Sequence, residues 1–125
     1  MKILVVVEDD PDVRFLIETI FSMDSRFALA DVAESAEDAL EAVRTDQPDI
    51  IVLDQGLAGA LTGLEVAPRL KQVAPNGKII LFTAHAELKT RADENPDIDG
   101  FLLKTESAQL LPLAQALTGL SAPSS

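Results

Sequence analysis

Two short apolar runs of this chain each end in carboxylates. The run ILVVV is followed directly by Glu8, Asp9 and Asp10, and the run IIVL is followed by Asp54. Uncharged segments rich in β-branched residues are typical of parallel strands that are buried on both faces. Ligand sites in open α/β sheets form at the edge where the strands reach their carboxyl ends. The sequence therefore predicts a cluster of carboxylates at one edge of a parallel sheet.

Two further apolar runs end in side chains of a different kind. IILF is followed by Thr83 and FLL by Lys104, so a hydroxyl and an ammonium group are predicted at the same edge. Two carboxylates about 4 Å apart repel each other by about 4 kcal/mol at an effective dielectric constant of about 20, so the acids call for a cation. Oxygen ligands without cysteine favour Mg²⁺, or Mn²⁺. With Asp54 as the nucleophile, this is the chemistry of phosphoryl transfer.

The rest of the chain predicts alternating strands and helices. The predicted strands are Lys2–Val7, Phe27–Ala33, Ile50–Asp54, Lys78–Thr83 and Gly100–Lys104. The predicted helices begin after Asp10 and after Ser35, and then span Gly63–Val73, Ala86–Glu94 and Glu106–Leu117, the last one bent at Pro112. The core face of the first helix is predicted to consist of Val13, Leu16, Ile17, Ile20 and Phe21. Helices between parallel strands predict an α/β sheet that is covered on both faces.

Composition narrows the classes of function. At 125 residues the chain is expected to form one domain, residues 1–119, with a flexible tail at 120–125. A formal net charge of -11 argues against binding to nucleic acid or to an anionic membrane, since phosphate contacts need clustered Lys and Arg. The sequence contains no apolar stretch of about 18 residues, as a membrane span requires. With no evident signal peptide and no cysteine, we expect a cytoplasmic protein.

Four motifs, VVEDD, IIVLD, LFTA and GFLLK, occur in an order and at intervals that resemble the receiver domain of bacterial two-component response regulators. The chemotaxis regulator is the simplest member of that family. The resemblance covers nearly the whole chain. It implies a flavodoxin-like, doubly wound sheet of five parallel strands in the order 2-1-3-4-5, with five helices. It also implies that Asp54 accepts a phosphoryl group from a phosphohistidine on a histidine kinase or a phosphotransfer protein.

The resemblance implies roles for further residues. Glu8 and Asp9 correspond to the acidic pair that holds Mg²⁺, together with Asp54 and the backbone carbonyl of Gly56. The family's hydroxyl and lysine correspond to Thr83 and Lys104, and Ala84 corresponds to a small residue beside the phosphoryl site. Phe101 occupies the position of an aromatic residue that follows the threonine when the domain is phosphorylated. His85 occupies a position that borders the attacking water during dephosphorylation, and its pKa range would suit it to tune that water.

The chain departs from the family pattern in two places. Ala58 stands where the family usually has proline, and the nearest matching glycine is Gly63, nine residues after Asp54. The loop GLAGALTG is therefore expected to be one residue longer than usual and unusually apolar. After the fifth strand the family's Lys-Pro pair is Lys104-Thr105 here, so the cis peptide bond common at that place is not expected.

These features predict a stand-alone, monomeric response regulator that signals by protein contact through the fourth helix, fifth strand and fifth helix. Its only catalysis would be its own phosphorylation and dephosphorylation. A phosphorelay intermediate or a phosphate sink would carry the same residues. A pseudo-receiver that takes no phosphate is a further alternative because of the altered loop. A Mg²⁺-dependent phosphatase is disfavoured, because Gly56 stands where such enzymes usually have a second acid.

Overall fold

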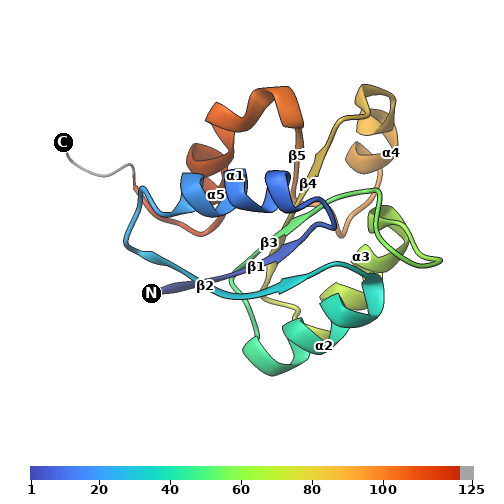
Figure 1. The fold of residues 1–125 in the computed structure, drawn as a ribbon, viewed down its shortest axis with the longest axis horizontal. Helices are drawn as coiled ribbons and strands as arrows, with labels where there is room; N and C mark the ends of the chain where they lie inside the picture. Colours follow the sequence, from blue (N-terminus) through green and yellow to red (C-terminus); the bar gives the residue numbers. More distant parts are fainter. Residues whose placement is uncertain (122–125) are drawn as a thin grey trace.

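Five parallel strands form a single sheet in a computed structural model that describes residues 1–121 (Figure 1). The strands are β1 (Lys2–Val7), β2 (Phe27–Ala33), β3 (Ile50–Leu53), β4 (Lys78–Thr83) and β5 (Gly100–Leu103). Their order is β2-β1-β3-β4-β5, which confirms the predicted doubly wound, flavodoxin-like architecture. All pairings are parallel, so the carboxyl ends of the strands meet at one edge.

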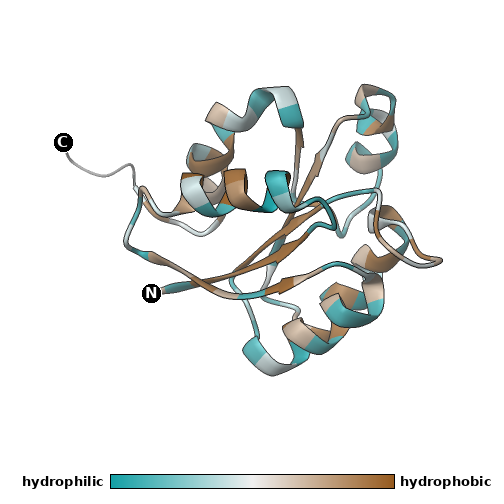
Figure 2. Cartoon of the chain, viewed as in Figure 1, coloured by the Kyte–Doolittle hydropathy of each residue, from teal (hydrophilic) through white to brown (hydrophobic). Residues whose placement is uncertain are grey.

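Helices cover both faces of the sheet. The helix α1 (Pro11–Phe21) packs on one face with α5 (Leu110–Leu117), while α2 (Ala36–Asp46), α3 (Gly63–Val73) and α4 (Lys89–Asp93) pack on the other (Figure 1). The central strands are apolar except for the lysines that begin β1 and β4 and the threonine that ends β4, whereas most helices also carry polar residues on their outer side (Figure 2). Each face therefore has its own apolar core, and polar residues are left mainly for the sheet edges and the outer helix surfaces.

Local sequence fixes where the first three helices begin. The Asp10 side chain accepts a hydrogen bond from the backbone N–H of Asp12, and Pro11 occupies the first helical position. Ser35 caps α2 by accepting from the backbone of Asp38. Thr62 begins α3 with a reciprocal capping box, which the sequence alone did not predict. These caps set the bounds of the loops that surround the carboxyl edge.

The last two helices are shorter than predicted. The segment predicted as a single fourth helix is a 3₁₀ turn, Ala86–Leu88, followed by the single-turn helix α4. The predicted fifth helix begins as a 3₁₀ segment, Lys104–Gln109, and α5 starts only at Leu110. Pro112 lies in the first turn of α5, where a missing N–H costs little, and the irregular backbone is at Glu106 instead. The predicted bend at Pro112 is therefore wrong.

Two details of the strands and the first helix also differ from prediction. The third and fifth strands end one residue earlier than expected, so Asp54 and Lys104 follow the strands rather than close them. Leu16 is 38% exposed, whereas Ile17 and Phe21 of the predicted core face are buried. Successive residues of a helix are turned by about 100°, so Leu16 lies at the margin of the buried stripe.

The end of the sheet opposite the acidic edge is held by one nearly buried carboxylate. Asp24 accepts hydrogen bonds from the Arg26 guanidinium and from Gln115 Nε2, which joins the loop after α1 to α5. Hydrogen bonds from Arg26 hold the pKa of that carboxyl well below its usual range. Arg26 also donates to the backbone carbonyl of Ser121, and Leu120 packs against the core. The packed chain thus extends two residues into the predicted tail, whose residues 122–125 lie outside the described residues.

Over residues 1–121, no helix is both long enough and apolar enough to cross a membrane.

Candidate functional site

The register of the sheet sets Glu8 beside Asp54. Val7 is the pairing partner of Leu53, and the backbone N–H of Asp54 donates to the carbonyl of Val7 at 2.9 Å. The next residue on each strand is therefore an acid, and both acids leave the sheet at the same level. Glu8 is 1% exposed and Asp54 is 8% exposed. Two carboxylates are thus held side by side and largely out of water.

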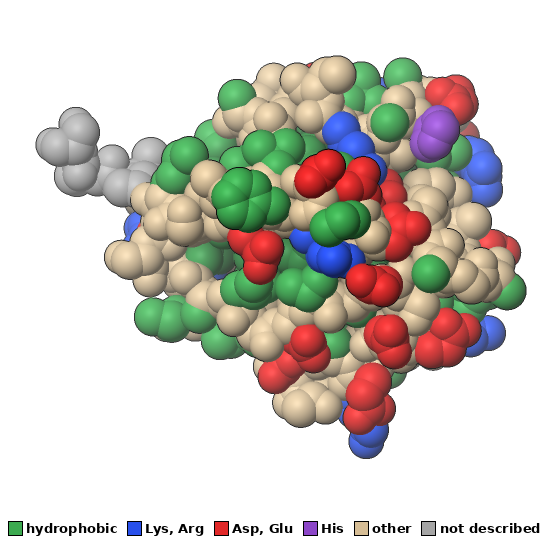
Figure 3. Space-filling model, in the orientation of Figure 1, with side chains coloured by type: hydrophobic (Ala, Val, Ile, Leu, Met, Phe, Trp, Pro, Cys, Tyr) green, Lys and Arg blue, Asp and Glu red, His purple; other side chains and the backbone are tan. Residues whose placement is uncertain are grey.

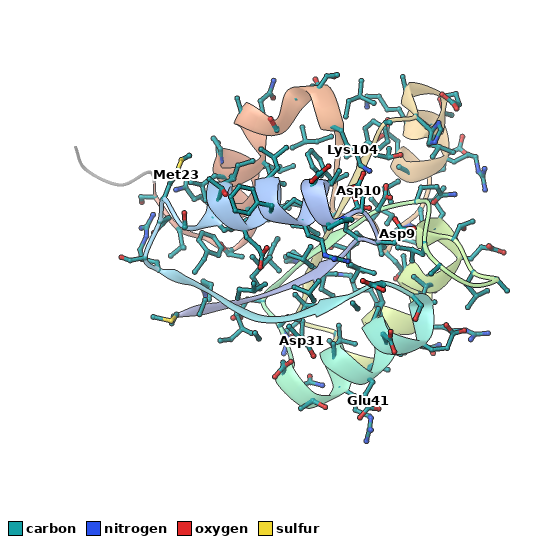
Figure 4. The ribbon with its side chains drawn as sticks, in the orientation of Figure 1. Asp9, Asp10, Met23, Asp31, Glu41 and Lys104 are labelled. Carbon is teal, nitrogen blue, oxygen red and sulfur yellow. The ribbon has the colours of Figure 1, made fainter. Side chains whose placement is uncertain are left out.

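Lys104 reaches both of these acids from the end of β5, across the intervening strand β4. Its ammonium nitrogen lies 3.0 Å from Oε1 of Glu8 and 3.4 Å from Oδ2 of Asp54. Since β5 is two strands away from β3, only the long lysine stem spans the distance to the central acids. Asp9, Asp10 and Lys104 are labelled at this end of the strands in Figure 4. One cation is therefore shared by two buried carboxylates.

The remaining negative charge suits a bound divalent cation. Glu8, Asp9 and Asp54 each offer a carboxylate oxygen, and these three oxygens lie within 4.8 Å of one another. Oε1 of Glu8 is buried and, despite the nearby ammonium, accepts no hydrogen bond of good geometry from the described residues. Oxygen ligands alone, with one acid open to solvent, match the preference of Mg²⁺ for a few carboxylates and retained waters. The residues present therefore fit Mg²⁺ or Mn²⁺.

Burial and mutual repulsion alter the ionisation of this cluster. Burial is the largest influence on Glu8 and, with the charge of Asp54, raises its pKa to about 7 against the opposing effect of Lys104. Burial by itself would lower the pKa of Lys104, but Glu8 and Asp54 outweigh it and raise that pKa above its usual value. Lys104 is therefore fully charged at neutral pH, whereas Glu8 of the metal-free protein is only partly ionised.

The other predicted site residues lie at the same edge or next to it. Thr83 ends β4 and is fully buried, and its Oγ1 accepts a hydrogen bond from the backbone N–H of His85 at 3.2 Å. The His85 side chain is 60% exposed, with Nδ1 3.3 Å from Oε1 of Glu87. Phe101 is half-buried against the core that α2, α3 and α4 cover. Ala84 is exposed immediately after Thr83.

The start of α3 is pressed against the backbone of Asp54. A Cβ atom on Gly63 would lie 2.2 Å from the carbonyl oxygen of Asp54, so only glycine fits there. The backbone carbonyl of Gln55 accepts from Gly63, and its side-chain Oε1 accepts from the backbone N–H of Leu64 at 2.9 Å. Gly56 is exposed beside the site, where a Cβ would lie 3.8 Å from Oδ2 of Asp54. The helix start thus fixes the backbone on which Asp54 sits.

The structure gives a reason for the unusual loop after Asp54. Leu57 and Leu61 are half-buried and pack against the core formed with α2 and α3. Ala58 pairs with Ser35 as an isolated parallel bridge, and its N–H donates to the carbonyl of Glu34 at 3.0 Å. Leu57 and Leu61 therefore anchor the loop to the core, and the loop runs beside the β2–α2 connection.

Two residues near the site were not predicted from the sequence. Gln55 secures the start of α3, and the Arg14 guanidinium donates to the backbone carbonyls of Glu8 and Asp9. The sequence did offer a signal for Arg14, because this residue lies in the first turn of a helix whose cap, Asp10, directly follows Glu8 and Asp9. Nothing in the sequence marked the contact of Gln55, because it depends on the path of the loop.

The close approach at Gly63 generates a prediction. Gly63→Ala should lower the free energy of unfolding by about 3 kcal/mol, because the added methyl group forces the loop and the Asp54 backbone apart. Urea denaturation would measure the loss. Gly56→Ala is the matched control, since its Cβ meets only an ordinary contact of 3.8 Å. Equal stabilities of the two variants would contradict the proposed role of this contact.

The raised pKa of Glu8 generates a second prediction, for the metal-free protein. Its folded-state pKa of about 7 exceeds the unfolded value of 4.5, so the folded protein binds this proton more tightly. The stability that the proton confers is complete below the unfolded pKa and is lost as the pH rises through the folded pKa. The loss should be at most about 3.5 kcal/mol, at about 1.4 kcal/mol per pKa unit. Urea denaturation with a chelator should show this decline relative to Glu8→Gln, and parallel pH curves would refute it.

Comparisons with known proteins agree with this geometry. The family model described as the response regulator receiver domain matches residues 4–115. The chain is 32% identical to the positive alginate biosynthesis regulatory protein of Pseudomonas aeruginosa, over 96% of this chain and 47% of that protein. It is 28% identical to the sporulation initiation phosphotransferase F of Bacillus subtilis, over 68% of this chain and 66% of that protein.

A solved structure shares the fold. The isolated REC domain of RcsB from Salmonella enterica serovar Typhimurium superposes with a TM-score of 0.83 at 19% identity, covering 97% of this chain and 91% of that one. The chain spans about half, or less, of the length of the curated relatives that it matches first. The family match extends over nearly all of the described strands and helices. The chain therefore belongs to the response regulator receiver domains of two-component systems.

Proposed function

We propose that this chain is a Mg²⁺-dependent phosphoacceptor switch that a histidine kinase or a phosphotransfer protein phosphorylates on Asp54. The observation that carries the proposal is the position of Asp54, largely buried, 3.4 Å from Lys104 Nζ and within one cluster with Glu8 and Asp9. A nucleophilic carboxylate beside a lysine and a cation site meets the requirements for transfer of a phosphoryl group.

The residues of the chain would divide the chemistry among them. An oxygen of Asp54 forms a bond to phosphorus as the P–N bond to the donor histidine breaks, and the electron pair of that bond stays on the imidazole. Glu8, Asp9, Asp54 and the carbonyl of Gly56 would hold Mg²⁺, which when bound offsets charge on the phosphoryl oxygens. Lys104 pairs with one of those oxygens, and the hydroxyl of Thr83 donates to another.

The switch would pass from Thr83 to Phe101. Thr83 is buried beside the site, and Phe101 lies on the neighbouring strand β5, half-buried. Phe101 borders a hollow of about 360 Å³ that Ala92 and Ile98 also line, and this hollow would give the ring a second place to pack. A phosphoryl group that draws Thr83 inward would shift the population of these two ring positions. The output surface would then be α4, β5 and α5, read by a partner protein in the cytoplasm.

A phosphorelay intermediate is the second candidate function. It is favoured by the similarity to the Bacillus subtilis protein, whose name describes a phosphotransferase. In a relay the phosphoryl group on Asp54 would pass on to another protein rather than alter a surface. The related regulators are longer than this chain. That the chain acts alone, as a monomer and without other catalysis, is therefore proposed as well.

Phosphorylation by a small-molecule donor tests the proposal directly. Incubation with acetyl phosphate and Mg²⁺ should add one phosphoryl group to the wild-type protein, detected by intact-protein mass spectrometry. Asp54→Asn should abolish the increment, because an amide is not a nucleophile of this kind, and chelation of Mg²⁺ should abolish it in the wild type. Asp93→Asn, which changes an exposed acid on α4, is the matched control and should be modified normally.

Two outcomes would contradict the proposal. A wild-type protein that gains no phosphoryl group from acetyl phosphate, or from a panel of histidine kinases, would be a pseudo-receiver. A protein that releases phosphate from added substrates over many turnovers would be a phosphatase.

His85 supplies a separate prediction about dephosphorylation. His85→Ala should change the lifetime of the aspartyl phosphate severalfold, because the imidazole lies two residues beyond Thr83, where it would border the water that attacks the phosphoryl group. The measurement is the decay of the phosphorylated form in wild type and variant between about pH 6 and about pH 8. Identical decay rates across that range would exclude His85 from the reaction.

A further inference from the structure

Arg14 makes three contacts that converge on the loop after β1. Its Nη1 donates to the backbone carbonyl of Glu8 at 3.2 Å and to that of Asp9 at 3.4 Å. The same nitrogen donates to Oε1 of Glu34 at 2.7 Å. The Arg14 side chain is 20% exposed, so this contact set is partly shielded from water. The two carbonyls belong to the acids whose side chains form the metal cluster with Asp54.

These contacts fix a stretch of backbone that the sheet leaves free. The N–H of Glu8 donates to Ala33 at 2.9 Å, which ties the loop to the end of β2, but β1 itself ends at Val7. The carbonyls of Glu8 and Asp9 therefore lie beyond the regular ladder. A guanidinium binds both of them and is itself held by Glu34, an acid that follows β2. All three contacts are made by Nη1, whose two hydrogens are shared among the three oxygens, and the planar guanidinium fixes where that nitrogen lies.

From this geometry we infer that Arg14 is a positioning residue for the cation site. It holds the Glu8–Asp9 backbone so that both carboxylates stay aimed at the place beside Asp54. Residues that orient metal ligands from behind typically change metal affinity by about 10- to 100-fold when they are altered. The inference rests on the proposed function, since it concerns the same Mg²⁺ site.

Charge alone predicts the opposite effect, which makes the inference testable. Arg14 is a cation next to an anionic site, so its removal would by electrostatics favour the binding of Mg²⁺. Loss of a positioning contact would weaken binding instead. Arg69 provides the matched control: it is exposed on α3, and within residues 1–121 it forms no side-chain hydrogen bond or ion pair. Its replacement changes the net charge by the same amount.

Isothermal titration with Mg²⁺ on the full chain separates these effects. Arg14→Met should raise the Kd for Mg²⁺ by about tenfold, while Arg69→Met should leave it unchanged or slightly lower. Arg14→Lys retains the charge, but its flexible stem does not fix the nitrogen where the planar guanidinium holds Nη1. It should therefore also raise the Kd, and it serves if Arg14→Met fails to fold. Urea denaturation of each variant checks that the protein is folded before titration.

Each result has one meaning. If the wild type binds Mg²⁺ and the folded Arg14 variants bind it with an equal or lower Kd, the role of Arg14 is overturned and the proposed function stands. If the wild type binds no Mg²⁺ at all, the proposed function fails and the positioning role fails with it. Weaker binding in both Arg14 variants, with normal binding in Arg69→Met, is the expected result.

Discussion

Repulsion between carboxylates is the constraint on which this structure depends. The parallel pairing of β1 with β3 brings Glu8 level with Asp54, and Asp9 follows at once. Buried like charges are costly, and a single lysine shared between two of the acids offsets only part of that cost. Burial first, and then the charge of Asp54, raise the pKa of Glu8 as a result. Such a cluster lowers stability and is retained in proteins where it supports a function.

The surrounding fold keeps these acids from moving apart. The sheet supplies their separation, and the start of α3 presses on the Asp54 backbone so closely that only Gly63 fits. The first turn of α1 holds the opposite side of the cluster through Arg14. The far end of the domain is tied independently through Asp24 and Gln115. Rigid support on several sides keeps the three carboxylates aimed at one point.

The sequence predicted the architecture and the convergence of the site residues well, because both follow from local patterns. Apolar runs identify buried parallel strands, and the residue after each run must lie at the carboxyl edge. The last two helices were predicted less well, since α4 has few apolar residues and the segment after Lys104 is 3₁₀. The contact of Gln55 was missed because it depends on the path of a loop, which no periodicity records. The contacts of Arg14 were missed although its place in the first helical turn after the two acids was a signal for them.

Because Lys104 contacts both Glu8 and Asp54, cation binding and phosphorylation of Asp54 would depend on each other. The ammonium lies 3.0 Å from Glu8 and 3.4 Å from Asp54, so the lysine already pairs with both acids. A phosphoryl group on Asp54 adds negative charge and requires this same ammonium. Lys104 can turn fully toward it once a bound cation or a proton compensates Glu8, whose buried Oε1 has no well-aligned donor of its own. Dependence on Mg²⁺ would thus arise from a shortage of positive charge, and Lys104 would link cation binding to phosphorylation.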